Sequence, residues 1–196
     1  MPDSYVTTET NRPAVSSQED RGSFTADISA IRQRARQKMD KGPVTTAYGK
    51  DVKEVIAVLN DVLATELVCW MRYSRHAISA SGIDRAQVTS QFTDHAKEER
   101  QHAMRVAERI NQLGGEPDFD PSTLTGRSHT TYETFPDNDL TEMLRDNLAA
   151  ERIVVETYSD IIRWLGTDDV TTRRLLEDIL REEEDHADDI VDLLGM

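Results

Sequence analysis

The sequence contains one cysteine, Cys69, and no apolar run that approaches the roughly 20 residues needed to cross a membrane. A single cysteine cannot form an internal disulfide bond, which excludes a disulfide-stabilised fold and fits a reducing compartment. No short apolar stretch follows Met1, as a secretory signal would require. We therefore predict a cytoplasmic protein without a membrane partner.

Aromatic residues are scarce, and the 37 acidic residues outnumber the 23 Lys and Arg residues. Phe, Trp and Tyr make up 6% of the 196 residues, apolar residues make up 37%, and the net charge is −14. With this modest apolar content, we expect some segments to lie outside a packed core. The acidic character disfavours nucleic acid and would attract cations, although an acidic surface kept for solubility explains it equally well.

A stretch of net positive charge lies near the N-terminus of this acidic chain. Residues 1–24 are rich in Ser, Thr, Asp, Glu and Pro without apolar periodicity, which predicts a mobile tail. Residues 25–50 are predicted to contain a short basic helix and a linker, with Asp27 as the helix cap and the Gly-Pro pair at residues 42–43 as its end. Residues 28–41 carry a charge of +4, which leaves −18 for the rest of the chain. The apolar stripe of this helix comprises Ile28, Ile31, Ala35 and Met39, and its basic residues are Arg32, Arg34, Arg36, Lys38 and Lys41.

Four long segments with helical apolar periodicity make up most of the remaining chain. They cover about residues 51–80, 86–113, 140–165 and 170 to near the C-terminus. Short links with glycine join the first segment to the second and the third to the fourth, so each pair should form an antiparallel hairpin. A longer connection with three prolines, residues 114–139, separates the two pairs. We predict an all-α four-helix bundle over residues 51–196, built from two antiparallel hairpins and a long crossover.

Charged residues interrupt the apolar stripes of these helices at corresponding places. The second and fourth helices each contain a Glu-x-x-His motif, whose two side chains project from one helix face, and the first and third each carry a Glu on the apolar stripe. Four buried carboxylates would be very unfavourable unless they were paired or bound metal. Oxygen and imidazole ligands without thiolate suit iron or manganese and tolerate zinc, and this distribution over four helices is the di-iron carboxylate arrangement. The predicted metal-binding and catalytic residues are Glu66, Glu99, His102, Glu151, Glu183 and His186.

The two halves of the chain repeat this pattern. The lone Glu of each half precedes the Glu of its motif by 33 residues in the first half and by 32 in the second. Tyr73 lies seven residues after Glu66, and Tyr158 lies seven residues after Glu151. Seven residues are about two helical turns, so each Tyr is expected to share a face with its Glu. One Glu-x-x-His motif alone would more simply be a solvated helix face, whereas two motifs with matching partners favour a metal centre.

Four stretches resemble the ferritin-like superfamily, specifically bacterioferritins and Dps-like proteins with a bacterioferritin-type di-iron site. They are LNDVLATELVCWMRY, HAKEERQHA, LAAERIVVETY and EEEDHADD, and the resemblance covers about residues 51–195. The resemblance implies two iron ions per subunit, bound through two bridging glutamates, two terminal glutamates and two histidines. The implied bridging glutamates are Glu99 and Glu183, and the implied terminal glutamates are Glu66 and Glu151. The implied histidine ligands are His102 and His186.

The same resemblance implies a ferroxidase that oxidises Fe(II) with O2 or H2O2 and stores Fe(III) in a homo-oligomeric shell, in iron homeostasis and oxidative-stress protection. Bacterioferritins place a haem-binding Met directly after the second-helix Glu, where this chain has Arg100, so haem is not expected. The chain stops ten residues after His186, which is closer to the smaller Dps-like shells than to large ferritin cages. Trp70 and Tyr73 could supply further electrons or simply fill the core, and Cys69 is interpreted as a small buried side chain.

Two other functions remain open from the sequence. A peroxide-consuming protein like rubrerythrin or manganese catalase would use the same di-metal bundle, although the Cys-rich module of rubrerythrin is absent. A Dps-like DNA-protecting protein could contact phosphates through residues 28–41. Packing of that helix against the acidic body of its own or a neighbouring subunit is the favoured interpretation, so nucleic acid is not the favoured partner. His76, His95 and His129 lack a partner ligand at useful spacing and are interpreted as structural or exposed.

Overall fold

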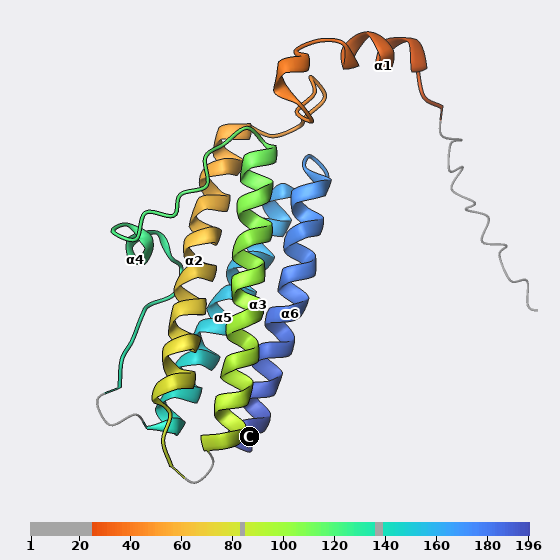
Figure 1. The fold of residues 1–196 in the computed structure, drawn as a ribbon. Coiled ribbons are helices and arrows are strands. Elements are labelled where there is room, and N and C mark those ends of the chain that lie inside the picture. The colour runs from red at the N-terminus through yellow and green to blue at the C-terminus, as the bar shows by residue number, and fades with distance from the viewer. Residues whose placement is uncertain (1–24, 83–84, 136–138) are drawn as a thin grey trace, which may run out of the picture.

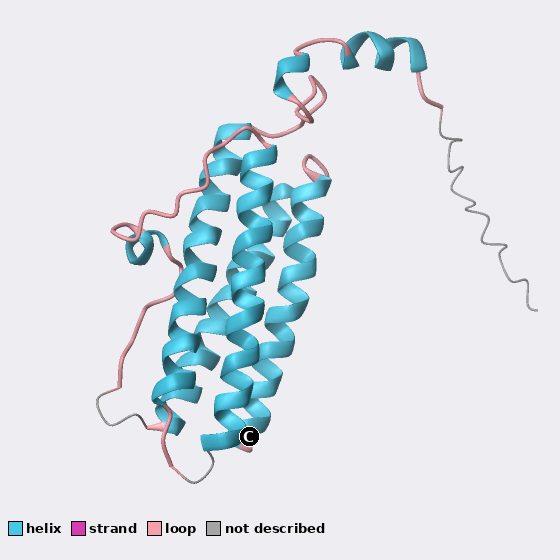
Figure 2. Cartoon of the chain, viewed as in Figure 1, coloured by secondary structure: helices cyan, strands magenta, loops and turns pink. Residues whose placement is uncertain are grey.

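The computed structural model describes residues 25–82, 85–135 and 139–196, and the predicted tail of residues 1–24 lies outside the described residues. Within these ranges the secondary structure is helical, without a β-strand (Figure 2). The long helices are α2 (Val52–Ser79), α3 (Arg85–Gln112), α5 (Leu140–Leu165) and α6 (Val170–Leu194). The short elements are α1 (Ile28–Ala35), the 3-10 turn η1 (Met39–Lys41) and α4 (Leu124–Arg127).

The four long helices form two antiparallel hairpins, α2 with α3 and α5 with α6 (Figure 1). Between the hairpins, α3 contacts α6 and α2 contacts α5. The crossover from α3 to α5 runs back along the outside of α2, where α4 contacts that helix. The predicted all-α four-helix bundle with two hairpins and a long crossover is confirmed.

Aspartate caps and a glycine fix where the long helices begin and end. The side chains of Asp51, Asp139 and Asp169 accept hydrogen bonds from backbone N–H groups in the first turns of α2, α5 and α6. The α5 helix stops at Gly166, whose φ of 55° lies in the left-handed region that favours glycine. These local signals explain why the helices begin and end within one residue of the bounds that the sequence predicts.

Two apolar clusters fill the bundle. One lies toward the end at which α2 begins and includes Leu63, Val106 and Ile179, and the other lies toward the opposite end and includes Phe92 and Met143. Every long helix contributes side chains to both clusters. On α3, α5 and α6 the predicted ligand positions lie between these two contributions, whereas on α2 Glu66 lies near the end of the stretch that packs into the first cluster. The two clusters therefore bracket a polar layer at mid-bundle.

The predicted short basic helix is present as α1, but it ends earlier than expected. The Asp27 carboxylate accepts a hydrogen bond from the backbone N–H of Ala30 at 2.9 Å, as predicted for a cap. The helix stops at Ala35, and Lys38 adopts the left-handed conformation with a φ of 49°. The prediction that Met39 continues the apolar stripe is wrong, because the turn at Lys38 redirects the chain before η1 begins.

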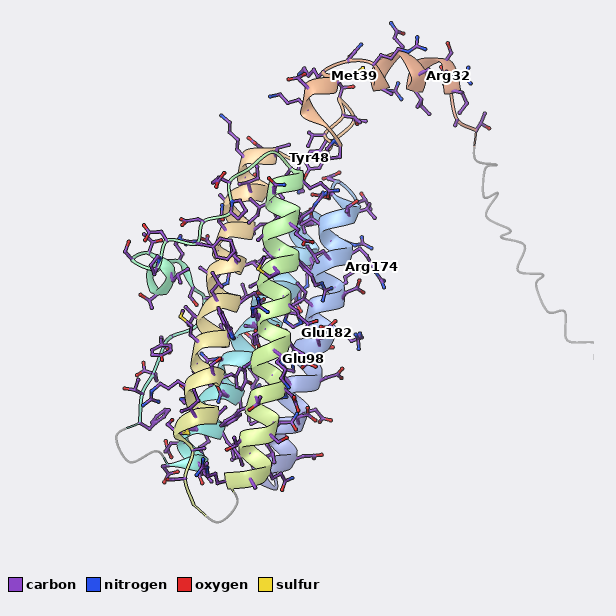
Figure 3. All side chains as sticks on the ribbon, viewed as in Figure 1. Arg32, Met39, Tyr48, Glu98, Arg174 and Glu182 are labelled. Atoms are coloured by element: carbon purple, nitrogen blue, oxygen red, sulfur yellow. The ribbon has the colours of Figure 1, made fainter. Side chains whose placement is uncertain are left out.

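The α1 helix projects away from the end of the bundle (Figures 1 and 3). None of its residues is buried, and Ile28 and Ile31 are 51% and 43% exposed. The interpretation that this helix packs against the body of its own subunit is therefore wrong, while packing against a neighbouring subunit stays a prediction. The linker is attached by Tyr48, whose phenol donates a hydrogen bond to Asp169 at the turn between α5 and α6.

None of the helices in the described part of the chain combines the length and the apolar character that crossing a membrane would require.

Candidate metal centre

All six residues that the sequence predicts as metal ligands meet in the polar layer between the two apolar clusters. Each of the four long helices supplies at least one of them, and every one of the six is at most 2% exposed. The lone glutamates come from α2 and α5, and the two Glu-x-x-His pairs come from α3 and α6. The helical spacing of three residues thus directs each Glu and His of a motif inward, as expected.

The ligand atoms fall into two overlapping groups. In the first group, one atom each of Glu66 and His102 lies within 4.8 Å of atoms of Glu99 and Glu183. The second group combines Glu151 and His186 with the same Glu99 and Glu183 within the same limit. Two carboxylates therefore belong to both groups. This arrangement suits two neighbouring cations that share two bridging carboxylates.

Inward-facing atoms of this cluster lack the partners that buried polar atoms normally have. At least one oxygen of each of the four glutamates, and Nδ1 of both histidines, is buried without a well-directed hydrogen bond. The closest approaches are 2.9 Å from His102 Nδ1 to Glu183 and 3.4 Å from His186 Nδ1 to both Glu99 and Glu183. Such orphaned atoms, all directed at one layer, fit a site for divalent cations.

Without a cation, protons compensate the carboxylates. Contact with Glu183 and Glu66 raises the pKa of His102 to about 12, although burial alone would lower it. Burial and the neighbouring Glu183 raise the pKa of Glu99, and they raise that of Glu151 to about 8. Contacts with both histidines lower the pKa of Glu183, against the opposite effect of burial. A cation would displace these protons, because ligating imidazole must be neutral and ligating carboxyl groups ionised.

The outer nitrogen of each histidine meets a carboxylate that the sequence analysis did not identify. His102 Nε2 lies 2.7 Å from Glu182, and His186 Nε2 lies 2.7 Å from Glu98. Figure 3 labels both glutamates at mid-height of the bundle, on the side of α3 and α6. A carboxylate behind a metal-binding His orients its ring and raises its basicity. The signal was present, because a second Glu immediately precedes each Glu-x-x-His motif.

The two tyrosines of the repeat, Tyr73 and Tyr158, each form a hydrogen bond to the opposite hairpin. The Tyr73 phenol donates a hydrogen bond to Glu151, and the Tyr158 phenol donates one to Glu66. Burial and the nearby carboxylates raise the pKa of both phenols, which keeps the O–H groups protonated. The sequence predicts that each Tyr shares a helix face with the Glu of its own half, whereas its hydrogen-bond partner is the Glu of the other half.

The remaining candidates lie outside both ligand groups. Cys69 is buried beside Arg72, and burial raises the pKa of its thiol. Trp70 packs partly buried against the core. His76 is hydrogen-bonded to Asn147, so its structural interpretation agrees with its surroundings.

His95 lies closer to the centre than the sequence suggested. Its ring stacks on that of His186 with a centroid distance of 4.1 Å, and it is 1% exposed. Burial and the neighbouring His186 lower its pKa to about 4. Its polar neighbour Asp189 is 94 residues away in the sequence, so spacing on α3 alone does not reveal this position.

Comparison with known proteins gives one family. The model of the Ferritin-like domain family matches residues 56–196. A bacterioferritin of Desulfovibrio desulfuricans is 31% identical over 137 residues, which cover 68% of this chain and 70% of that protein. A nutrient stress-induced DNA-binding protein of a Synechococcus species is 30% identical over 140 residues, covering 70% of this chain and 78% of that protein.

Solved structures agree with these relatives. The bacterioferritin-related protein of Bacteroides fragilis, described as a dodecameric thioferritin, superposes with a TM-score of 0.72 at 34% identity and covers 75% of this chain and 88% of its own. Dps of Thermosynechococcus elongatus reaches a TM-score of 0.69 at 17% identity, over 72% of this chain and 90% of its own, and supports the fold alone.

Proposed function

This chain belongs to the family of proteins with a ferritin-like domain, and from that premise we propose that its buried centre is a di-iron ferroxidase site. At the level of the family, the relatives support iron storage and protection against oxidative stress. We propose that the protein oxidises Fe(II) with O2 or H2O2 and stores Fe(III) inside a homo-oligomeric shell. The observation that carries the proposal is the set of orphaned, buried ligand atoms contributed by both hairpins.

The six proposed ligands can be assigned to two cation positions. Glu99 and Glu183 belong to both ligand groups and would be shared by two substrate Fe(II) ions. Glu66 with His102 would complete one position, and Glu151 with His186 the other. The list of proposed ligands is thus the set predicted from sequence.

The redox balance is simple. Two Fe(II) ions supply two electrons, which reduce O2 to H2O2 with two protons, or H2O2 to two water molecules with two protons. Protons are available nearby, because His102 and the raised-pKa carboxyl of Glu151 must release theirs when a cation binds. Glu182 and Glu98 then hold the two imidazoles in the ligating orientation.

An anaerobic Fe(II) titration of the full-length protein tests this function, followed by separate additions of O2 and H2O2. We expect saturation that includes two Fe(II) per chain at the centre, rapid oxidation and continued mineral growth. Turnover of peroxide without mineral growth would favour the rubrerythrin-like or manganese-catalase-like alternative instead. The exposed Glu108→Gln variant on α3 is the matched control and should behave as the wild type.

DNA binding is a second candidate, which the exposed α1 helix favours. Arg32, Arg34 and Arg36 are all exposed on a segment that projects from the bundle (Figure 3). If these three side chains contact phosphates, replacing all of them with Ala should reduce the slope of log affinity against log salt by about 2.7. A gel-shift series at several salt concentrations measures this slope, and a slope unchanged by the substitutions would exclude α1 as the DNA contact.

A further inference from the structure

Three polar side chains converge outside the six-residue centre, on the surface where α3 and α6 meet. His95 Nε2 lies 2.8 Å from the amide nitrogen of Gln91 and 3.3 Å from the carboxylate of Asp189. The same Gln91 nitrogen lies 2.6 Å from Asp189. These residues come from two different helices, and none of them belongs to the proposed di-iron ligand set.

The spacing of the three atoms is close to that of ligands around a small divalent cation. With metal–ligand bonds of about 2.1 Å, neighbouring ligands lie roughly 3.0–3.4 Å apart in octahedral or tetrahedral geometry. Small side-chain movements would bring these atoms to that spacing. Rotation of the Gln91 amide presents its oxygen, so that the three residues offer one imidazole nitrogen and two oxygens. This donor set suits Fe(II), Mn(II), Co(II) or Zn(II).

The hydrogen-bond geometry at His95 is also compatible with a ligand role. In the present arrangement two nitrogens, His95 Nε2 and the Gln91 amide, face each other at 2.8 Å. The amide nitrogen carries hydrogens, so this contact is favourable only when His95 Nε2 presents its lone pair. A lone pair at this position is what a cation requires.

One of the three side chains is buried and held in place, whereas another faces solvent. His95 is 1% exposed and is held by its stack on His186, whereas the Asp189 side chain is 51% exposed. Glu98, bound to the outer nitrogen of the same His186, adds a second negative charge nearby. A cation could therefore reach this position from solvent without passing through the apolar clusters.

We propose that Gln91, His95 and Asp189 form a third divalent-cation site, on the outer side of His186. The site lies one imidazole ring away from the di-iron centre, so it is placed to hold Fe(II) on its way into or out of that centre. This transfer role rests on the proposed ferroxidase function, whereas the binding of the cation does not.

Cobalt(II) titration of the full-length assembled protein, followed by visible absorption and calorimetry, tests the site without any oxidation step. We expect three Co(II) per chain in the wild type and two in both His95→Phe and Asp189→Asn. The His95→Phe variant keeps an aromatic ring against His186 but removes the ligand nitrogen. Asp188→Asn, an exposed neighbour, is the matched control for loss of charge and should keep three.

A double variant tests the third cation site independently of the proposed ferroxidase function. In Glu99→Gln/Glu183→Gln, which removes both shared carboxylates, one Co(II) per chain should remain and should be lost on adding Asp189→Asn. Two Co(II) in the wild type, or a third that persists in both His95→Phe and Asp189→Asn, would overturn the site. A protein that binds three Co(II) but does not oxidise Fe(II) would overturn only the ferroxidase function.

Discussion

The two halves of the candidate metal centre have matching proposed ligands but different surroundings. In the half formed by Glu66 and His102, the outer carboxylate of Glu182 is also paired with Arg105 at 3.3 Å and with Arg181 at 3.5 Å. In the half formed by Glu151 and His186, the outer carboxylate is Glu98, whose ion pair among the described residues is with His186. The two halves therefore have the same types of proposed ligand but different charges around the outer carboxylate. For this reason the two positions should bind cations with different affinities.

The largest expected effect comes from replacing either of the two shared carboxylates, Glu99 or Glu183. Both Glu99→Gln and Glu183→Gln should abolish rapid Fe(II) oxidation, because each removes a ligand from both positions. Their metal-free stabilities should differ. Loss of Glu183, which contacts both histidines, should cost about 3–5 kcal/mol, because it leaves buried charges without their partner. Glu99 has a raised pKa from burial, so a neutral Gln should change stability by less than about 1 kcal/mol.

Urea unfolding of the metal-free variants, beside Fe(II) oxidation rates, measures both quantities. Near-normal oxidation in both variants would contradict the centre itself. Equal stabilities would leave the centre in place but contradict the assignment of Glu183 as the carboxylate that holds both histidines.

A smaller effect is expected for the outer carboxylates, one in each half. Glu182→Ala should weaken the position of His102 and Glu98→Ala that of His186, each by about 10–100-fold in cation affinity. Stepwise Co(II) binding, measured in the Asp189→Asn background without the proposed third site, resolves which of the two equivalents at the centre weakens in each variant. Glu184→Ala, at an exposed position on α6, is the control. Weaker binding of the same Co(II) equivalent in both variants would contradict the assignment of one outer carboxylate to each cation position.

The crossed tyrosines provide a test of how the halves are connected. Tyr73→Phe and Tyr158→Phe should each lower metal-free stability by about 1.5–3 kcal/mol, because each removes a buried hydrogen bond to a carboxyl group. In double-mutant cycles, Tyr73→Phe should couple with Glu151→Gln and should be nearly additive with Glu66→Gln. Coupling with Glu66 instead would restore the same-half pairing that the sequence suggested.

The smallest effect concerns Arg105, one of the two arginines that pair with the outer carboxylate in the His102 half. Arg105→Gln should strengthen Co(II) binding at the His102 position by about twofold to threefold, since a unit charge several Å away is worth roughly 0.5 kcal/mol in a water-like dielectric. The effect should vanish at about 1 M salt, where the screening length falls to about 3 Å. Arg174→Gln, an exposed substitution elsewhere on α6 (Figure 3), should leave both equivalents unchanged.

Local signals made the fold and the six candidate ligands predictable from the sequence. Helix bounds follow from caps such as Asp51 and stops such as Gly166, and the i, i+3 spacing places Glu99 beside His102 on one face. Contacts between distant segments were not predictable in the same way. Nothing local pairs Tyr73 with Glu151 or His95 with Asp189, because each contact depends on how two hairpins dock. The early end of α1 reflects the left-handed conformation of Lys38, which its sequence does not signal.

The crossed contacts also bear on how the protein folds. The N-terminal hairpin leaves the ribosome first, with Glu66 and His102 in place but without the phenol of Tyr158 or the carboxylate of Glu182 that support them. It also lacks the shared Glu183. A half-synthesised chain therefore cannot assemble a complete cation position and should capture iron only weakly. In the proposed centre, a metal ion would be bound only after both hairpins have formed, and it would then stabilise their docking late in folding.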